Sequence, residues 1–167
     1  MASYIASVCL RDDHEAISII DSARKSSVES PILVNNYAFS LASLGNIPEA
    51  EKVLSNLRDV QLDDRERGTI LATKGLIEFR KGNINEGRNL YEKAVASFRK
   101  KENFPSMAIA SMFRAREEIL IHSEFSESVL KEATTLAEKH GVKEISEYAT
   151  FLASQIKTHG LQNHDQS

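Results

Sequence analysis

A ten-residue pattern recurs four times along the chain, and this recurrence limits the possible folds more than any other feature. The copies begin at residues 11, 45, 82 and 123 and read RDDHEAISII, GNIPEAEKVL, GNINEGRNLY and SEFSESVLKE. Each copy has a glutamate followed by a small residue, and successive glutamates are 34, 37 and 41 residues apart. A unit of this length typically forms a helix–turn–helix, which buries its apolar face only by stacking on neighbours. The sequence therefore predicts an array of helix pairs.

Apolar spacing and helix-end residues predict an all-α fold of about nine helices, because no segment alternates with the period of a strand. The expected helices cover residues 2–10, a segment capped by Asp12 or Asp13 that ends near Lys25, 32–44, 47–58, a segment capped by Asp63 or Asp64 that ends near Lys81, 84–101, 106–122, 126–140 and 143–158. Glycines 45, 82 and 141 follow helices, where a left-handed turn is favoured. The polar tail after Gly160 is expected to be disordered.

We expect a single domain over residues 1–158. The repeat copies are assigned to 2–26, 32–58, 64–101 and 106–140, followed by a capping helix at 143–158 and a disordered tail at 159–167. The capping helix carries Lys143, Glu144 and Glu147 on its second face, and a terminal repeat needs such a polar outer face.

Composition indicates the cellular compartment in which the protein is expected. The chain has 167 residues, is 41% hydrophobic and 27% charged, and carries a formal net charge of −3. The single cysteine, Cys9, excludes an intramolecular disulfide and fits a reducing compartment. The chain has neither a run of about 18 apolar residues nor a signal peptide with a basic start. We therefore expect a cytoplasmic location and no membrane association.

The helix pairs of two copies carry similar residues at matching positions. One copy has Tyr37, Ala38, Leu41, Gly45, Ala50 and Leu54, and the next has Gly75, Gly82, Gly87 and Tyr91, with Glu78 at a position of large residues. In this pattern the chain resembles the tetratricopeptide repeat (TPR) family over roughly residues 11–140, although the family's frequent tryptophan is absent. The resemblance implies a right-handed superhelix of stacked antiparallel helix pairs.

The copy at 106–140 departs from the family pattern. Arg116 stands where a small residue is expected, and Ser123 replaces the turn glycine. The copy at 2–26 keeps only its second helix. Small residues that permit close helix contact are expected at Ala38, Ala50, Gly75, Gly87 and Ser128. Replacing Ala50 or Gly87 with leucine should overpack the stack and cost roughly 1–3 kcal/mol.

No set of residues predicts catalysis, a cofactor or a metal site. The five histidines, His14, His122, His140, His159 and His164, do not stand at ligand spacing from one another. Each aspartate pair, Asp12-Asp13 and Asp63-Asp64, stands at a helix start, where capping explains it better than acid–base chemistry. We therefore expect that the protein is not an enzyme and has no cofactor.

Basic residues concentrate in the middle of the chain. They are Arg80, Lys81, Arg88, Lys93, Arg99, Lys100 and Lys101, and Glu78, Glu86, Glu92 and Glu102 are interleaved with them. Mixed charge indicates a solvated face rather than a phosphate-binding surface, so no nucleic-acid partner is expected.

By resemblance to the TPR family, the first helix of each pair lines a concave groove that binds a peptide or helix. The groove positions are Asn35, Asn36, Phe39, Thr73, Leu76, Phe79, Arg80, Phe113, Arg114 and Glu117. The asparagines are expected to face the groove, because a buried carboxamide needs several partners. For the three phenylalanines, core packing is an equal alternative. Asn35, Phe39, Thr73 and Ala110 do not match the Lys, Asn and Arg set with which some family members hold acidic chaperone tails, so we expect no such clamp.

The sequence pattern and the family resemblance leave two possible functions of different class. The first is a non-catalytic scaffold that binds a peptide, a helix or a second copy of the chain, with a homodimer as one form. The second is a regulatory or sensor domain of a larger protein, whose DNA-binding or catalytic domain would lie on another segment. The incomplete helix pair at residues 2–10 is consistent with either a fragment or a dimer.

Overall fold

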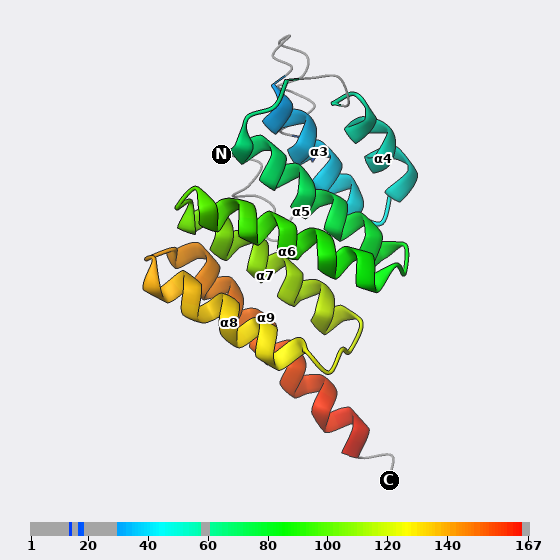
Figure 1. Cartoon of the computed structure of the whole chain (residues 1–167). Helices are drawn as coiled ribbons and strands as arrows, with labels where there is room; N and C mark the ends of the chain where they lie inside the picture. The colour runs from blue at the N-terminus through cyan, green and yellow to red at the C-terminus, as the bar shows by residue number, and fades with distance from the viewer. Residues whose placement is uncertain (1–13, 15–16, 19–29, 58–60, 165–167) are drawn as a thin grey trace. The chain divides into compact units, whose positions relative to one another are not determined.

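The computed structural model describes residues 14, 17–18, 30–57 and 61–164 of the chain. These residues form seven helices, and within these ranges there is no strand, so the all-α prediction is confirmed. The chain divides into two compact units, residues 1–98 and 99–167, and Figure 1 labels their helices. The predicted helix at 2–10, most of the next one up to Lys25, and the aspartates at 12 and 13 lie outside the described residues.

Unit 1 contains α3 (Pro31–Ser43), α4 (Ile47–Ser55), α5 (Asp64–Arg80) and nearly all of α6 (Ile84–Lys100). The first helix starts at Pro31, after Ser30 accepts a hydrogen bond from the Leu33 amide at 3.2 Å. Asp63, rather than Asp64, caps α5 and forms a capping box with Glu66. Short polar side chains satisfy free amides at helix starts, so both helices begin close to their predicted positions.

Four turns within the described residues share one hydrogen-bond pattern. The residues at the left-handed position are Gly45 (φ 85°), Gly82 (φ 84°), His122 (φ 53°) and Gly141 (φ 67°). In each turn this residue donates to the carbonyl three residues earlier, at 3.0 Å in the first three turns and 3.2 Å at Gly141, and the following residue donates to the carbonyl five residues earlier, at 2.9 Å. This arrangement satisfies the last carbonyls of the helix.

Close packing of α5 on α6 depends on two glycines. A Cβ atom on Gly87 would lie 2.5 Å from the Phe79 ring, and one on Gly75 would lie 2.8 Å from the Tyr91 ring. The two glycines also face each other, because the Gly75 carbonyl oxygen would be 3.1 Å from a Cβ on Gly87. In the preceding hairpin Ala38 and Ala50 are both fully buried. The expected small-residue contacts are therefore present in unit 1.

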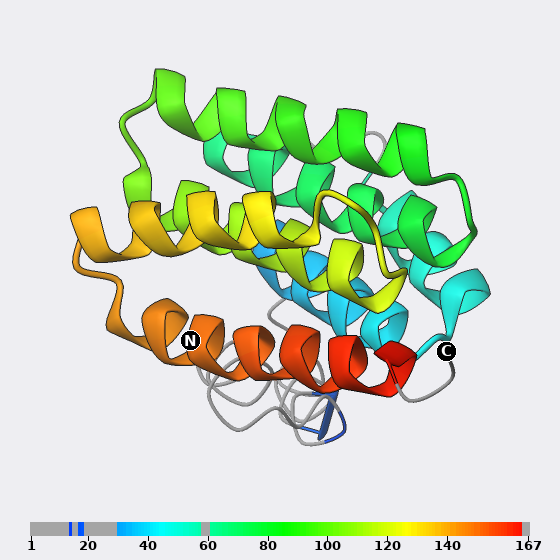
Figure 2. The same ribbon diagram turned by 90° about the horizontal axis from the view of Figure 1, so that it is seen from below.

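Unit 2 contains α7 (Phe104–Leu120), α8 (Ser126–Lys139) and α9 (Lys143–His164). The α8 and α9 helices lie side by side in both ribbon views (Figures 1 and 2), and α9 also contacts α7. The α7 helix starts at Phe104, two residues before the predicted start at 106, because Asn103 caps it and Pro105 is tolerated in the first turn.

The predicted end of α9 at residue 158 is wrong. The helix continues to His164, so residues 159–164 are helical and were not expected to be. Gly160 lowers helix propensity by only about 1 kcal/mol, and no proline follows to stop the helix. Within the described residues, no helix is both long and apolar enough to cross a membrane.

The predicted register of the copy at 106–140 is also wrong. The left-handed residue is His122, not Ser123. In unit 1 the buried small residue of the first helix of each hairpin, Ala38 or Gly75, lies seven positions before the left-handed turn residue. The same count back from His122 gives Ala115, which is fully buried, rather than Arg116.

The second helix of this hairpin also differs from the expectation. On α8 the buried small residue is Ser126, and Ser128 is exposed. The first helical residue of α8 is four positions after His122, whereas α4 and α6 begin two positions after their glycines. The longer turn moves the close contact to the first residue of the helix, where the Ser126 hydroxyl donates to the Glu118 carbonyl at 2.9 Å.

Candidate functional site

The predicted groove residues of α3 differ in accessibility. Asn36 and Phe39 are half-buried, whereas Asn35 is only 2% exposed. The expectation that Asn35 faces an open groove is wrong, because it shares one helix face with the fully buried Ala38 and Ala42. Among the described residues, nothing donates a hydrogen bond to the Asn35 side-chain oxygen.

The predicted groove residues of α5 pack in the interior, except at the end of the helix. Thr73, Leu76 and Phe79 are all buried, and the Thr73 hydroxyl donates to the Thr69 carbonyl at 3.3 Å. The Phe79 ring packs on the Tyr91 ring, with centroids 6.0 Å apart, which corresponds to the core alternative for this residue. Arg80 is exposed. Only Arg80 of this group is open to direct contact with a partner.

Two of the three predicted groove residues of α7, Arg114 and Glu117, belong to a largely buried charged cluster, and the third, Phe113, is buried. Glu117 is 1% exposed and accepts a hydrogen bond from the Arg116 Nε at 2.8 Å. The Arg114 Nε lies 3.8 Å from a carboxylate oxygen of Glu118, which is fully buried. The Arg116 guanidinium carbon also lies 5.0 Å from the centre of the Phe113 ring. We call Arg114, Arg116, Glu117 and Glu118 the α7 charge cluster.

The α7 charge cluster satisfies buried charges by pairing them along one helix. An unpaired buried charge is costly, whereas a paired one is tolerated. The sequence reasoning did not identify Arg116 or Glu118 as interior residues. The available signal was the segment RAREE inside an otherwise apolar helix, read in the register that His122 sets.

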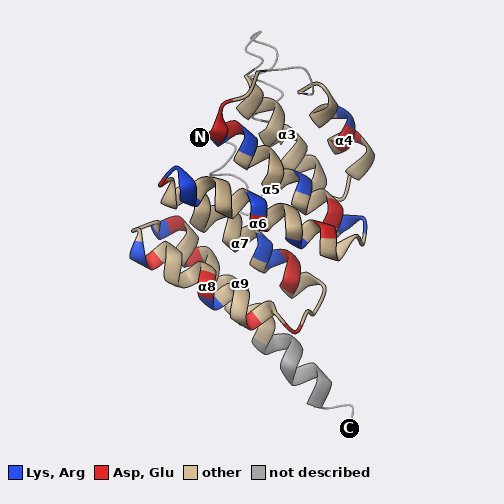
Figure 3. Cartoon of the chain, viewed as in Figure 1, with Lys and Arg blue, Asp and Glu red and all other residues tan. Residues whose placement is uncertain are grey.

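The α4–α5 side of unit 1 carries an exposed charged contact. The Lys81 ammonium lies 2.9 Å from Glu51 and 3.0 Å from Glu78, and the Asn83 amide donates to Glu78 at 2.6 Å. The Asn83 hydrogen bond and the Lys81 charge hold the pKa of Glu78 below its usual value near 4.5. Hydrogen bonds to Glu51 and Glu78 raise the pKa of Lys81. Charged residues of both signs lie along α5 and α6 (Figure 3), as the sequence predicted for a solvated face.

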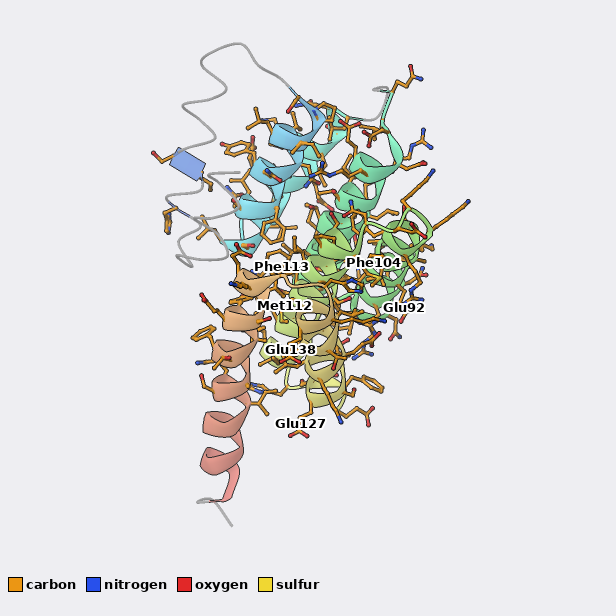
Figure 4. All side chains as sticks on the ribbon, turned by 90° about the vertical axis from the view of Figure 1, so that its left-hand side faces the viewer. Glu92, Phe104, Met112, Phe113, Glu127 and Glu138 are labelled. Atoms are coloured by element: carbon orange, nitrogen blue, oxygen red, sulfur yellow. The ribbon has the colours of Figure 1, made fainter. Side chains whose placement is uncertain are left out.

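An open groove lies between α8 and α9, and sequence reasoning did not predict it. Its volume is about 700 Å³. The α8 side is lined by Glu127, Leu130, Lys131, Thr134, Thr135 and Glu138, and the α9 side by Ser146, Ala149, Thr150, Ala153 and Ile156. Glu127 and Glu138, which are labelled in Figure 4, mark the two ends of its α8 side. No predicted groove residue lines it.

Two histidines, His140 and His122, contribute to local structure. The His140 ring stacks on Phe104 with centroids 4.2 Å apart and an angle of 5° between the planes, and His122 takes the turn position. Over the ranges that the structure describes, no three His, Cys, Asp or Glu side chains gather where they could hold a metal ion.

Comparison with known proteins gives no family assignment: no protein-family model, curated protein or solved structure matches the chain.

Proposed function

We propose that the chain is a non-catalytic helical-repeat protein of the TPR type, which binds a peptide or helix of another protein. In this proposal the helix pairs stack as a right-handed superhelix, and the first helices of the pairs form its inner wall. The single observation that supports it is the repeated hairpin: a left-handed turn residue with a small buried residue seven positions earlier, at Ala38, Gly75 and Ala115. A unit that recurs in this way stacks to form an extended surface.

The accessible members of the predicted groove are the best candidates for direct contact. Asn36 and Phe39 are half-buried, Arg80 is exposed, and the Arg114 side chain is 20% exposed. A carboxamide and a guanidinium bind peptide backbone and carboxylate groups, respectively, and a phenylalanine provides apolar contact. The buried members would act by holding the wall in place.

Site-specific photo-crosslinking tests this proposal. A photoreactive amino acid at Asn36 or at Arg80 should capture the same partner from cell extract, which mass spectrometry then identifies. The matched control is Glu92, which is exposed on α6. Capture of one protein from both test positions and not from Glu92 supports the proposal. Equal capture at all three positions, or none, contradicts it.

The proposed architecture has its own test. An experimental structure of the full chain should show the helix pairs stacked side by side with the α3, α5 and α7 helices on one face. A closed bundle would contradict the superhelix.

A further inference from the structure

The α8–α9 groove has apolar side chains along its length and hydroxyl side chains at its edges. Leu130 and Ala149 are buried, and Ala153 and Ile156 are half-buried. Thr135 and Thr150 are exposed. An apolar groove of this kind between two helices commonly binds a third, amphipathic helix.

Helices of this chain already pack in this way. In unit 2, α9 contacts both α7 and α8, and in unit 1, α5 contacts both α3 and α4. Each of these helices therefore lies against the pair that precedes it. The groove presents the next pair, α8 and α9, for the same kind of contact.

The turn beside the groove exposes large apolar side chains. Leu120 is 54% exposed, Ile121 39% and Phe125 44%. Phe125 is two residues before Glu127, at one end of the groove. Single exposed apolar residues need no explanation, but three in one turn indicate a contact surface.

The charged side chains that line the groove are Glu127 and Glu138 at the two ends of its α8 side, with Lys131 between them, a net charge of −1. Over their whole lengths α8 and α9 carry five glutamates and four lysines, which is also a net charge of −1. A helix with a cation near each end would complement the two glutamates, whereas an acidic helix would place like charges against them.

We propose that the α8–α9 groove binds a cationic amphipathic helix of another protein. Glu127 and Glu138 are 11 residues apart, which is about 16 Å along a helix, so the ligand needs roughly three turns with Lys or Arg near both ends. Small or aliphatic residues would face Ala153 and Ile156, a large apolar residue would meet Phe125, and a neutral or acidic residue would lie opposite Lys131. This site shares no residue with the proposed inner wall, so the two proposals fail independently.

Titration of the full chain with two synthetic helical peptides tests the site. Both peptides have 18 residues and the same alanine and leucine stripe; one carries lysines at both ends of that stripe and the other carries glutamates. The lysine peptide should bind, and the glutamate peptide should bind at least tenfold more weakly. Fluorescence anisotropy measures both affinities, and NMR shift changes should centre on Thr135, Thr150 and Ala153.

Three variants separate the groove from general charge effects. Ala153→Arg should weaken the lysine peptide at least tenfold, and the double variant Glu127→Lys, Glu138→Lys should reverse the preference between the peptides. Glu92→Lys, on α6, should change neither affinity by more than twofold. Circular dichroism confirms that each variant is folded.

The proposal is overturned if the wild-type chain binds neither peptide, or binds both equally. It is also overturned if Ala153→Arg keeps full affinity for the lysine peptide. Light scattering that shows a wild-type dimer which Ala153→Arg converts to a monomer would assign the groove to a second copy instead.

Discussion

The α5–α6 hairpin of unit 1 and the α7–α8 hairpin of unit 2 make the same turn with different residues. In the first, Gly82 takes the left-handed position, and Gly75 and Gly87 bring the helices together. In the second, His122 takes that position, Ala115 and Ser126 are the buried small residues, and three charged side chains, Arg116, Glu117 and Glu118, lie in the interior. Both hairpins have the same backbone plan, but the stability of the second also depends on paired charges.

The largest expected effect is on the α7 charge cluster. Arg116→Ala would leave the Glu117 carboxylate buried without its 2.8 Å partner, so we expect a loss of about 3–5 kcal/mol in the free energy of unfolding. Urea denaturation measures it. The double variant Arg116→Met, Glu117→Leu removes both charges and should be neutral or stabilising. A double variant as unstable as Arg116→Ala would show that packing, not charge pairing, dominates.

The glycine contact of unit 1 should respond to added volume. Gly87→Ala places a methyl group 2.5 Å from the Phe79 ring and should cost about 1–3 kcal/mol, with Gly87→Leu at least as costly. Thermal unfolding followed by circular dichroism gives the change. Asn89→Ala, exposed on the same helix, is the control and should stay within about 0.5 kcal/mol. If Gly87→Ala matched this control, the close approach of α5 and α6 would not be rigid.

Substitutions at the two left-handed turn residues should change the stability of the two hairpins in opposite directions. His122→Gly removes a side chain from a left-handed position and should stabilise unit 2 by about 1 kcal/mol, whereas Gly82→Ala should destabilise unit 1 by about the same amount. Denaturation midpoints of both variants measure the pair of effects. Two changes of the same sign would contradict the shared turn geometry.

The smallest effect is expected at the half-buried Glu78 carboxylate. Glu78→Gln should cost at most about 0.5–1 kcal/mol at neutral pH, because the contact is solvent-screened. The pKa of Glu78 is lowered in the folded state, so its contribution is present above its usual value near 4.5 and is lost as pH falls through the lower, folded value. The free energies of unfolding of the wild-type chain and of Glu78→Gln, measured as a function of pH, should therefore converge at acid pH. A constant difference would rule out the charge as the cause.

Sequence reasoning predicted the hairpins of unit 1 well, because their turns use glycine and their helix starts use Pro31 and Asp63. It failed in unit 2, where a histidine adopts the left-handed turn and a longer connection shifts Ser126 into the buried position. The repeat pattern aligns Ser128 with Ala50 and Gly87, which sets the register one residue late on α7. In that register Arg116 occupies a small-residue position, whereas in the structure it pairs with Glu117.

The candidate site was less predictable than the fold. Whether Asn35 or Asn36 is accessible depends on which face of α3 meets its neighbours, and adjacent residues of similar polarity carry no pattern that distinguishes them. The α8–α9 groove depends on the distance between two helices, which periodicity within each helix does not report.

The α7 helix is buried along nearly its whole length, from Met107 to Ile119, with only Ile109 and Arg114 partly open. Amide protons of such a helix exchange with deuterium only when the surrounding structure opens. In native-state exchange, α7 should therefore be the last segment of unit 2 to lose its protection, well after the outer ends of α8 and α9.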